Sequence, residues 1–152
     1  REFSNVIVVR TVSKIGMAAL RLGYAVGDPA WMRELEKLRP PYNVNAMTQA
    51  MAPLLLAEEA LLAGQAKAIC AERERVAAAL AALPGVRGWP THTNFVLARF
   101  ADADATFDHL RSAGILVKNM HGTHPSLANC LRITVGTPTE NDALLHALGA
   151  LS

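Results

Sequence analysis

Hydrophobic residues recur along the chain at helical and strand spacings, and the order of these patterns divides the sequence into two parts. Up to about residue 83 the pattern predicts two short strands followed by helices, with strands at 6–11 and 23–27 and helices at 29–39, 43–62 and 65–83. Beyond residue 85 strands and helices alternate, with strands at 94–100, 115–118 and 130–135 and helices at 104–113 and 137–151. We therefore predict an α/β part followed by a small α+β part.

Individual residues mark where these helices begin and end. Asp28, which precedes a proline, is a good N-cap, and Thr137 to Glu140 form a capping box. Pro53 predicts a kink or break inside the second helix. Gly64 is expected to separate the second helix from the third, and Gly114 to end the fourth.

The composition argues against several classes of function. The chain has 152 residues, of which 51% are hydrophobic, and this is enough for one sizeable core. A net charge of +2 without a basic stripe gives no indication of nucleic-acid binding. No apolar run has the length of a membrane span, and no signal-peptide pattern opens the chain. Cys70 and Cys130 lack metal-ligand spacing and are expected in the core, which fits a reducing, cytoplasmic setting.

Lys14 is the first candidate for chemistry. It follows the apolar run Val6–Val9, in a polar stretch expected at the carboxyl end of a buried strand, where ligands collect in α/β sheets. With the hydroxyl of Ser13 and the guanidinium of Arg21, it suits pyridoxal phosphate, which needs an amine for its aldehyde and donors for its phosphate. A surface turn with two solvated cations is the plainer alternative. A serine–lysine nucleophile pair is disfavoured, because adjacent side chains on an extended backbone point in opposite directions.

The whole string Thr11–Tyr24 resembles the lysine motif of the fold-type I pyridoxal-phosphate aminotransferases of class I/II. The resemblance implies that Lys14 bonds covalently to the cofactor and that Ser13 and Arg21 bind the cofactor phosphate. It also implies an α/β fold, comprising the end of the large cofactor-binding domain and a small C-terminal α+β domain, and a homodimer in the full-length enzyme.

Arg132 is the second candidate. An arginine between apolar neighbours on a strand is often an edge-strand cation or part of a structural ion pair. A guanidinium can also hold a carboxylate with two parallel hydrogen bonds, as an aminotransferase requires for its substrate. The string Leu131–Thr137 resembles the family segment whose arginine performs that task.

Two further stretches resemble the histidinol-phosphate aminotransferase branch of this family. One is Arg39–Asn45 followed by Thr48 and Gln49, and the other is Gly114–Lys118 followed by Leu131–Asn141. That branch often has arginine at the position of Lys118, in contact with the substrate phosphate. The resemblance also places Asn94 near the substrate, and Tyr42 is a candidate to face the active site. A strand-start asparagine and a tyrosine covering a helix junction remain the alternatives.

The resemblance implies transfer of an amino group from histidinol phosphate to 2-oxoglutarate, in histidine biosynthesis. Another enzyme of the same fold, such as an aromatic-amino-acid aminotransferase or a threonine-phosphate decarboxylase, is an alternative. A non-catalytic binding or assembly module is an alternative from another class. No metal site is expected at His121 and His124, because no carboxylate or cysteine accompanies them.

Aminotransferases of this kind are usually well over twice as long, so the chain is expected to be a C-terminal part. Residues 1–63 would belong to the large domain, 64–84 to a connecting helix and 85–152 to the small domain. The family's aspartate under the cofactor ring and its stacking aromatic are not in this sequence. The chain alone is therefore expected neither to bind pyridoxal phosphate tightly nor to transaminate.

Overall fold

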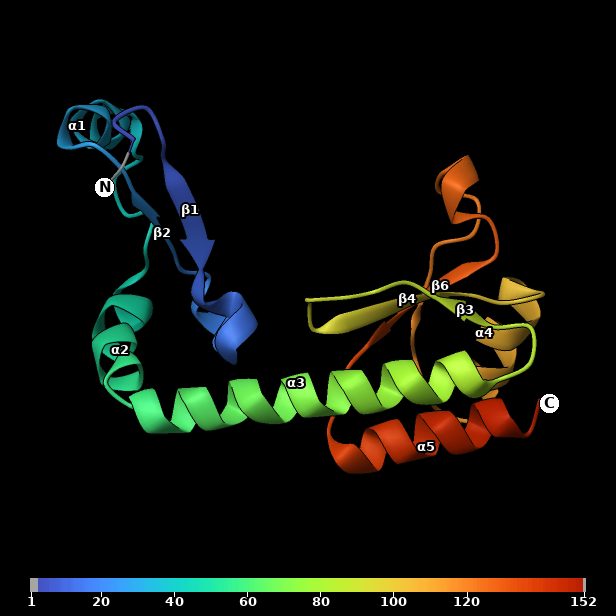
Figure 1. Cartoon of the computed structure of the whole chain (residues 1–152). Helices are drawn as coiled ribbons and strands as arrows, with labels where there is room; N and C mark the ends of the chain where they lie inside the picture. Colours follow the sequence, from blue (N-terminus) through green and yellow to red (C-terminus); the bar gives the residue numbers. More distant parts are fainter. Residues whose placement is uncertain (1–2, 152) are drawn as a thin grey trace. The chain divides into compact units, whose positions relative to one another are not determined.

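The computed structural model describes residues 3–151, which fold into two compact units (Figure 1). The units divide between Ala66 and Lys67, within one long helix. No helix in residues 3–151 is both long and apolar enough to cross a membrane.

The first unit is built on a short antiparallel strand pair. Its elements are β1 Val8–Thr11, the 3-10 turns η1 Val12–Ile15 and η2 Ala18–Leu20, β2 Gly23–Val26, α1 Pro29–Leu38, α2 Ala46–Leu56 and the start of α3 Glu59–Ala82. The register runs from Val8 opposite Val26 to Thr11 opposite Gly23. Both predicted strands are therefore present, joined by the polar segment that contains the candidate lysine.

Local capping fixes most helix starts in this unit. The Asp28 carboxylate accepts a hydrogen bond from the backbone N–H of Ala30 at 2.8 Å, which confirms the predicted start of α1.

The prediction of a break at Gly64 was wrong, because α3 begins at Glu59 and passes through that glycine. The break lies instead after Pro53, where α2 ends at Leu56. One glycine costs a helix only about 1 kcal/mol, which a helix of this length absorbs.

The strands of the first unit are not buried, contrary to the expectation from their apolar sequence. Every residue of β1 and β2 is exposed, and 74% of the Val9 surface is accessible. Large apolar side chains of this unit are exposed as well, among them Val6, Tyr24, Trp31 and Leu38. Two strands form one narrow sheet, and burying a run of β-branched residues on both faces requires further layers.

The second unit is an α+β fold with a four-stranded antiparallel sheet. It contains the end of α3, β3 Arg87–Gly88, β4 Phe95–Arg99, α4 Ala103–Ser112, β5 Lys118–Asn119, the 3-10 turn η3 Pro125–Leu127, β6 Cys130–Thr134 and α5 Pro138–Gly149. The strand order is β3-β4-β6-β5. Helices α3 and α5 run side by side in this unit (Figure 1).

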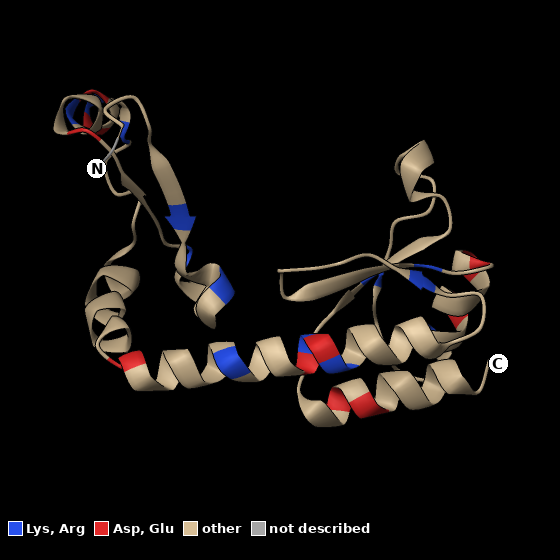
Figure 2. Ribbon diagram, viewed as in Figure 1, with Lys and Arg blue, Asp and Glu red and all other residues tan. Residues whose placement is uncertain are grey.

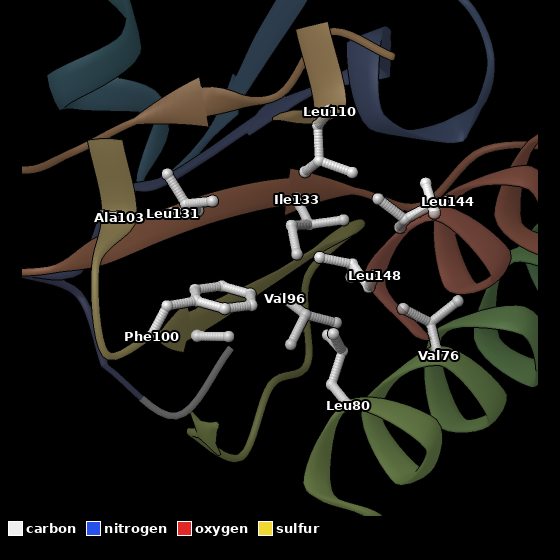
Figure 3. Packing of buried hydrophobic residues seen from close by; sticks show 12 residues of the cluster. Val76, Leu80, Val96, Phe100, Ala103, Leu110, Leu131, Ile133, Leu144 and Leu148 are labelled. Carbon is white, nitrogen blue, oxygen red and sulfur yellow. The ribbon is translucent and has the colours of Figure 1, made fainter. Parts of the chain in front are cut away.

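The core of the second unit lies on one face of this sheet (Figure 3). Alternate strand residues such as Val96 and Ile133 point into it and meet apolar residues of the three helices. The helices contribute Val76 and Leu80 from α3, Leu110 from α4, and Leu144 and Leu148 from α5. The other face of the sheet is therefore left to the remaining alternate residues.

Two strand predictions in this unit need correction. The two-residue strand β3 was missed, because so short a segment carries no periodicity. The strand predicted at 115–118 is reduced to β5, because Ile115 donates its backbone N–H to the Leu110 carbonyl at 2.8 Å and so belongs to the end of α4.

Gly114 adopts φ +78° at the end of α4, as expected. The capping box of α5 is confirmed, with the Thr137 N–H donating to Glu140 at 2.7 Å.

A polar network joins α3 to α5 within this unit. The buried Asn141 amide donates to Glu72 Oε2 at 2.7 Å, and Arg75 donates to the same oxygen at 2.7 Å. Arg75 also pairs with Asp142 at 2.7 Å. These hydrogen bonds from Arg75 and Asn141 hold the pKa of Glu72 below its usual value.

The two cysteines differ in environment. Cys130 is fully buried on β6, as predicted, whereas Cys70 is exposed on α3. The apolar face of α3 is carried by Val76 and Leu80, and Cys70 lies off that face.

Candidate active site

A closed turn in the first unit brings together the three residues of the lysine motif. Thr11 pairs with Gly23, and the Val12 N–H donates to the Leu22 carbonyl at 3.2 Å, so residues 12–22 form one loop with paired ends. Ser13, Lys14 and Arg21 all lie in this loop, the first two on the turn η1 and Arg21 directly after the turn η2.

The backbone of this loop is tightly turned. Gly16 adopts φ +93°, and a Cβ added there would lie 2.7 Å from Gln65 Oε1. Arg21 adopts φ +49° and ψ +36°, a left-handed conformation that is uncommon for a residue with a side chain. The Thr48 hydroxyl donates to the Leu20 carbonyl at 2.9 Å and fixes the turn that precedes Arg21. Such backbone conformations are concentrated at functional sites, so the geometry of this loop is that of a candidate site.

The side chains of the loop leave donors available. Thr11 Oγ1 accepts the Ser13 backbone N–H at 3.1 Å, which orients Ser13 without using its hydroxyl hydrogen. Lys14 and Arg21 are exposed, and within residues 3–151 neither side chain forms a hydrogen bond or an ion pair. A hydroxyl, a guanidinium and an amine in one loop fit the phosphate and the aldehyde of pyridoxal phosphate.

The second group of candidates lies on the outer face of the sheet, opposite the core. Arg132 on β6 is directly opposite Lys118 on β5 and Leu97 on β4. Register partners share a face, so Arg132 and Lys118 are cationic neighbours. Both are exposed, and no acidic residue pairs with either in residues 3–151.

The charged residues of the strands on this outer face are all positive. Figure 2 shows blue segments on the strands of the second unit. The charged residues on these strands are all basic: Arg87, Arg99, Lys118 and Arg132. Alternation and register place all four on the outer face. Such a face attracts anions.

The first two of these arginines are held by a tryptophan. The guanidinium carbons of Arg87 and Arg99 lie 5.7 and 5.3 Å from the centre of the Trp89 ring. Arg99 also donates to the Ser126 carbonyl at 2.9 Å. Both side chains therefore have structural contacts, although the buried Arg99 Nε has no hydrogen-bond partner among the described residues.

Asn94 and Tyr42, the remaining candidates, lie in different settings. Asn94 is half-buried next to β4, and its carbonyl accepts the Val135 N–H at 2.9 Å, which places it at the end of the sheet beyond Arg132. Tyr42 lies in the first unit between α1 and α2, is 94% exposed and adopts φ +60°. Within residues 3–151 its hydroxyl forms no hydrogen bond.

Sequence reasoning missed Phe95. The guanidinium carbon of Arg132 lies over its ring, 5.4 Å from the ring centre. The alternation in β4 carried the signal, since Val96 faces the core and its neighbours must face outward. The partner strand was needed to reveal the contact, because it depends on the register of β4 with β6.

The loop histidines have structural contacts. His121 Nδ1 accepts the Asn129 N–H at 2.9 Å, and His124 Nδ1 accepts the Ser126 N–H at 3.1 Å. Across the described residues, no three His, Cys, Asp or Glu side chains gather in a way that could hold a metal ion.

Comparison with known proteins identifies the class of this chain. The family model described as aminotransferase class I and II matches residues 1–148. The chain therefore belongs to the class I and II aminotransferase family, whose members use pyridoxal phosphate. The match includes both groups of candidate residues.

More specific similarity points to one branch. The chain is 52% identical over 147 residues to a histidinol-phosphate aminotransferase of Chromobacterium violaceum, covering 97% of this chain and 41% of that protein. It thus spans about two fifths of the length of this curated relative.

Solved structures agree with the fold. A putative aminotransferase from Burkholderia pseudomallei is 31% identical with a TM-score of 0.86, over 95% of this chain and 44% of that chain. The histidinol-phosphate aminotransferase of Sinorhizobium meliloti, solved with pyridoxal-5′-phosphate, is 30% identical with a TM-score of 0.81, over 99% of this chain and 43% of that chain. The α/β fold of this family, expected from the sequence, is confirmed.

Proposed function

We propose that the chain supplies part of a histidinol-phosphate aminotransferase. The whole enzyme would transfer the amino group of histidinol phosphate to 2-oxoglutarate, giving imidazole acetol phosphate and glutamate in histidine biosynthesis. The observation that carries the proposal is the closed loop with Ser13, Lys14 and Arg21, in a chain of this family. The similarity to histidinol-phosphate aminotransferases supports the choice of substrate.

The loop residues would have distinct roles. When bound, pyridoxal phosphate supplies an aldehyde and an electron-accepting ring. Lys14 Nζ would hold the cofactor at its aldehyde, and its amine would move the proton at the substrate Cα. Ser13 Oγ and the Arg21 guanidinium would hold the cofactor phosphate by hydrogen bonds.

The outer face of the sheet would bind the substrate. The Arg132 guanidinium can form two parallel hydrogen bonds to a carboxylate or a phosphate, and Lys118 adds a point charge directly opposite. Two cations side by side, neither of them paired with an acidic residue among residues 3–151, favour a dianion such as a phosphate monoester over a single carboxylate. Asn94 and Tyr42 would contribute polar contacts to the substrate.

We further propose how the chain divides within the whole enzyme. Residues 1–63 would end the large cofactor-binding domain, 64–84, which contain most of α3, would connect the two domains, and 85–152 would form the small domain. The exposed apolar side chains of the first unit support this, because apolar surface of that extent is normally covered by further protein. A homodimer in the cytoplasm is the proposed form of the whole enzyme.

An assembled enzyme tests the proposal. It consists of the part of the Chromobacterium violaceum relative that this chain does not match, joined to residues 1–152. We expect it to convert histidinol phosphate and 2-oxoglutarate to glutamate, and Lys14→Ala to abolish this at unchanged folding. Lys37→Ala, on the exposed surface of α1, is the matched control and should retain activity.

Two outcomes would contradict the proposal. Preference for phenylalanine over histidinol phosphate, or carbon dioxide release from threonine phosphate, would assign the chain to another enzyme of the same fold. Glutamate formation that survives Lys14→Ala would remove the lysine from the chemistry.

A further inference from the structure

We infer that Phe95 is a positioning residue for Arg132, holding the guanidinium at the place where it meets the anionic end of the substrate. The identity of that anion rests on the proposed function, whereas the contact between ring and guanidinium does not. Phe95 would touch neither cofactor nor reacting atoms, and would act only through Arg132.

The contact with Phe95 is the interaction that the structure records for the Arg132 side chain. The guanidinium carbon lies over the ring at 5.4 Å from its centre, within the range of a cation–π attraction. No hydrogen bond or ion pair involves that side chain among residues 3–151. The N–H groups of the guanidinium consequently remain available for an anion.

The positions of the two residues explain why the side chain leans toward the ring. Phe95 is opposite Thr134, so it is the diagonal neighbour of Arg132 across the β4–β6 pair. Diagonal neighbours lie within reach of aromatic and long side chains. Lys118 is directly opposite Arg132 on the other side and repels it. Attraction to Phe95 and repulsion from Lys118 act in the same direction.

The backbone of Phe95 is held in place by hydrogen bonds, and its ring lies outside the core cluster. Its carbonyl accepts hydrogen bonds from the hydroxyls of Thr91 at 2.8 Å and Thr93 at 3.1 Å. The core cluster of this unit does not include Phe95, whose neighbour Val96 takes the core position. A half-buried aromatic residue on the outer face thus serves the arginine rather than the packing of the core.

This arrangement has a kinetic consequence. An arginine held in one orientation loses less side-chain freedom when it binds an anion. Removing the ring should weaken substrate binding without changing the proton transfer, which Lys14 would carry out. The expected signature is a raised KM at nearly constant kcat.

The assembled enzyme provides the kinetic test. In Phe95→Leu we expect the KM for histidinol phosphate to rise about three- to tenfold, with kcat within about twofold and unchanged cofactor absorbance. Phe95→Tyr, which keeps the aromatic face, should restore the KM. Phe107→Leu is the matched control, because that ring contacts Arg111 at 5.8 Å on α4, and its KM should not change. An unaltered KM in Phe95→Leu, or no rescue by tyrosine, would overturn the inference.

A second readout separates this inference from the proposed function. In the 152-residue chain, the Arg132 Hδ protons should show ring-current shifts by NMR, identified by their absence in Arg132→Lys. Phe95→Leu should move these resonances to ordinary arginine positions, while Phe107→Leu leaves them in place. Shifts that persist in Phe95→Leu would refute the contact, whatever substrate the whole enzyme uses.

Discussion

In the loop of residues 12–22, called here the lysine loop, two residues adopt backbone conformations that could not be predicted from the sequence. Gly16 requires a left-handed conformation, and Arg21 adopts one despite its side chain. Ser13, Lys14 and Arg21 could be proposed as site residues from the sequence, because their chemistry is a property of residue type and the string around them resembles the family motif. Phe95 was not found, because its role depends on a cross-strand neighbour.

Replacement of Gly16 tests the geometry of the loop. Gly16→Ala should lower the free energy of unfolding by about 1–2 kcal/mol, because alanine is strained at φ +93° and its Cβ would press on Gln65. Gly64→Ala is the matched control: it lies inside α3 with open space around it and should stabilise the chain by up to about 1 kcal/mol. Urea unfolding of both variants gives the comparison, and a neutral Gly16→Ala would contradict the described loop.

At the scale of the elements, local sequence signals were sufficient to predict most boundaries of helices and strands. The remaining boundaries depend on contacts between residues distant in the sequence or on the length of the whole helix. The caps Asp28 and Thr137 act within one turn, so the sequence was sufficient to predict them. The break placed at Gly64 was wrong, because propensity is weak against a long helix. The short β3 depends on pairing with β4, a contact that no local pattern contains.

The joint between α3 and α5 gives a prediction at this scale. Asn141→Ala should lower the free energy of unfolding by about 2–3 kcal/mol, because the buried amide binds Glu72 and both backbone groups of Gly136. Asp142→Ala, at an exposed position one residue further on, should cost much less. If both variants lost the same free energy of unfolding in thermal or urea denaturation, the buried Asn141 amide would not be the main link between α3 and α5.

Glu72 in this joint and Glu140 in the capping box of α5 make stability depend on pH. Hydrogen bonds from Arg75 and Asn141 lower the pKa of Glu72, and those from Thr137 lower the pKa of Glu140. A lowered carboxyl pKa stabilises the fold above the unfolded value of about 4.3, and this contribution is lost as the pH falls through the folded pKa. Unfolding free energies measured from pH 7 downward should therefore decline below about pH 5, and the decline should be shallower in Glu72→Gln. An identical slope in both proteins would contradict this cause.

At the scale of the whole molecule, the two units differ in completeness. The second has a core between one face of its sheet and three helices, whereas the strands of the first expose their apolar side chains. The sequence predicted a buried strand at 6–11, as expected for a sheet covered on both faces. The strand is present but exposed. Its apolar sequence therefore fits a larger sheet, with covering layers on both faces, than the two strands of the first unit form.

This difference predicts how the chain behaves alone. The 152-residue chain should not bind pyridoxal phosphate tightly, because the lysine loop alone supplies only part of the contacts that the cofactor needs. Titration with the cofactor should leave the visible spectrum of free pyridoxal phosphate nearly unchanged. A saturable new absorbance band that disappears in Lys14→Ala would contradict this expectation.

The most direct test of the whole account is the site at which the cofactor attaches. The assembled enzyme would be loaded with pyridoxal phosphate, reduced with borohydride to fix the cofactor on its amine, digested and analysed by mass spectrometry. This chain contains four lysines, Lys14, Lys37, Lys67 and Lys118. We expect the phosphopyridoxyl group on Lys14 alone among them, in the peptide that also contains Ser13. Modification of another of these lysines with Lys14 left free, or no modification of this chain, would contradict it.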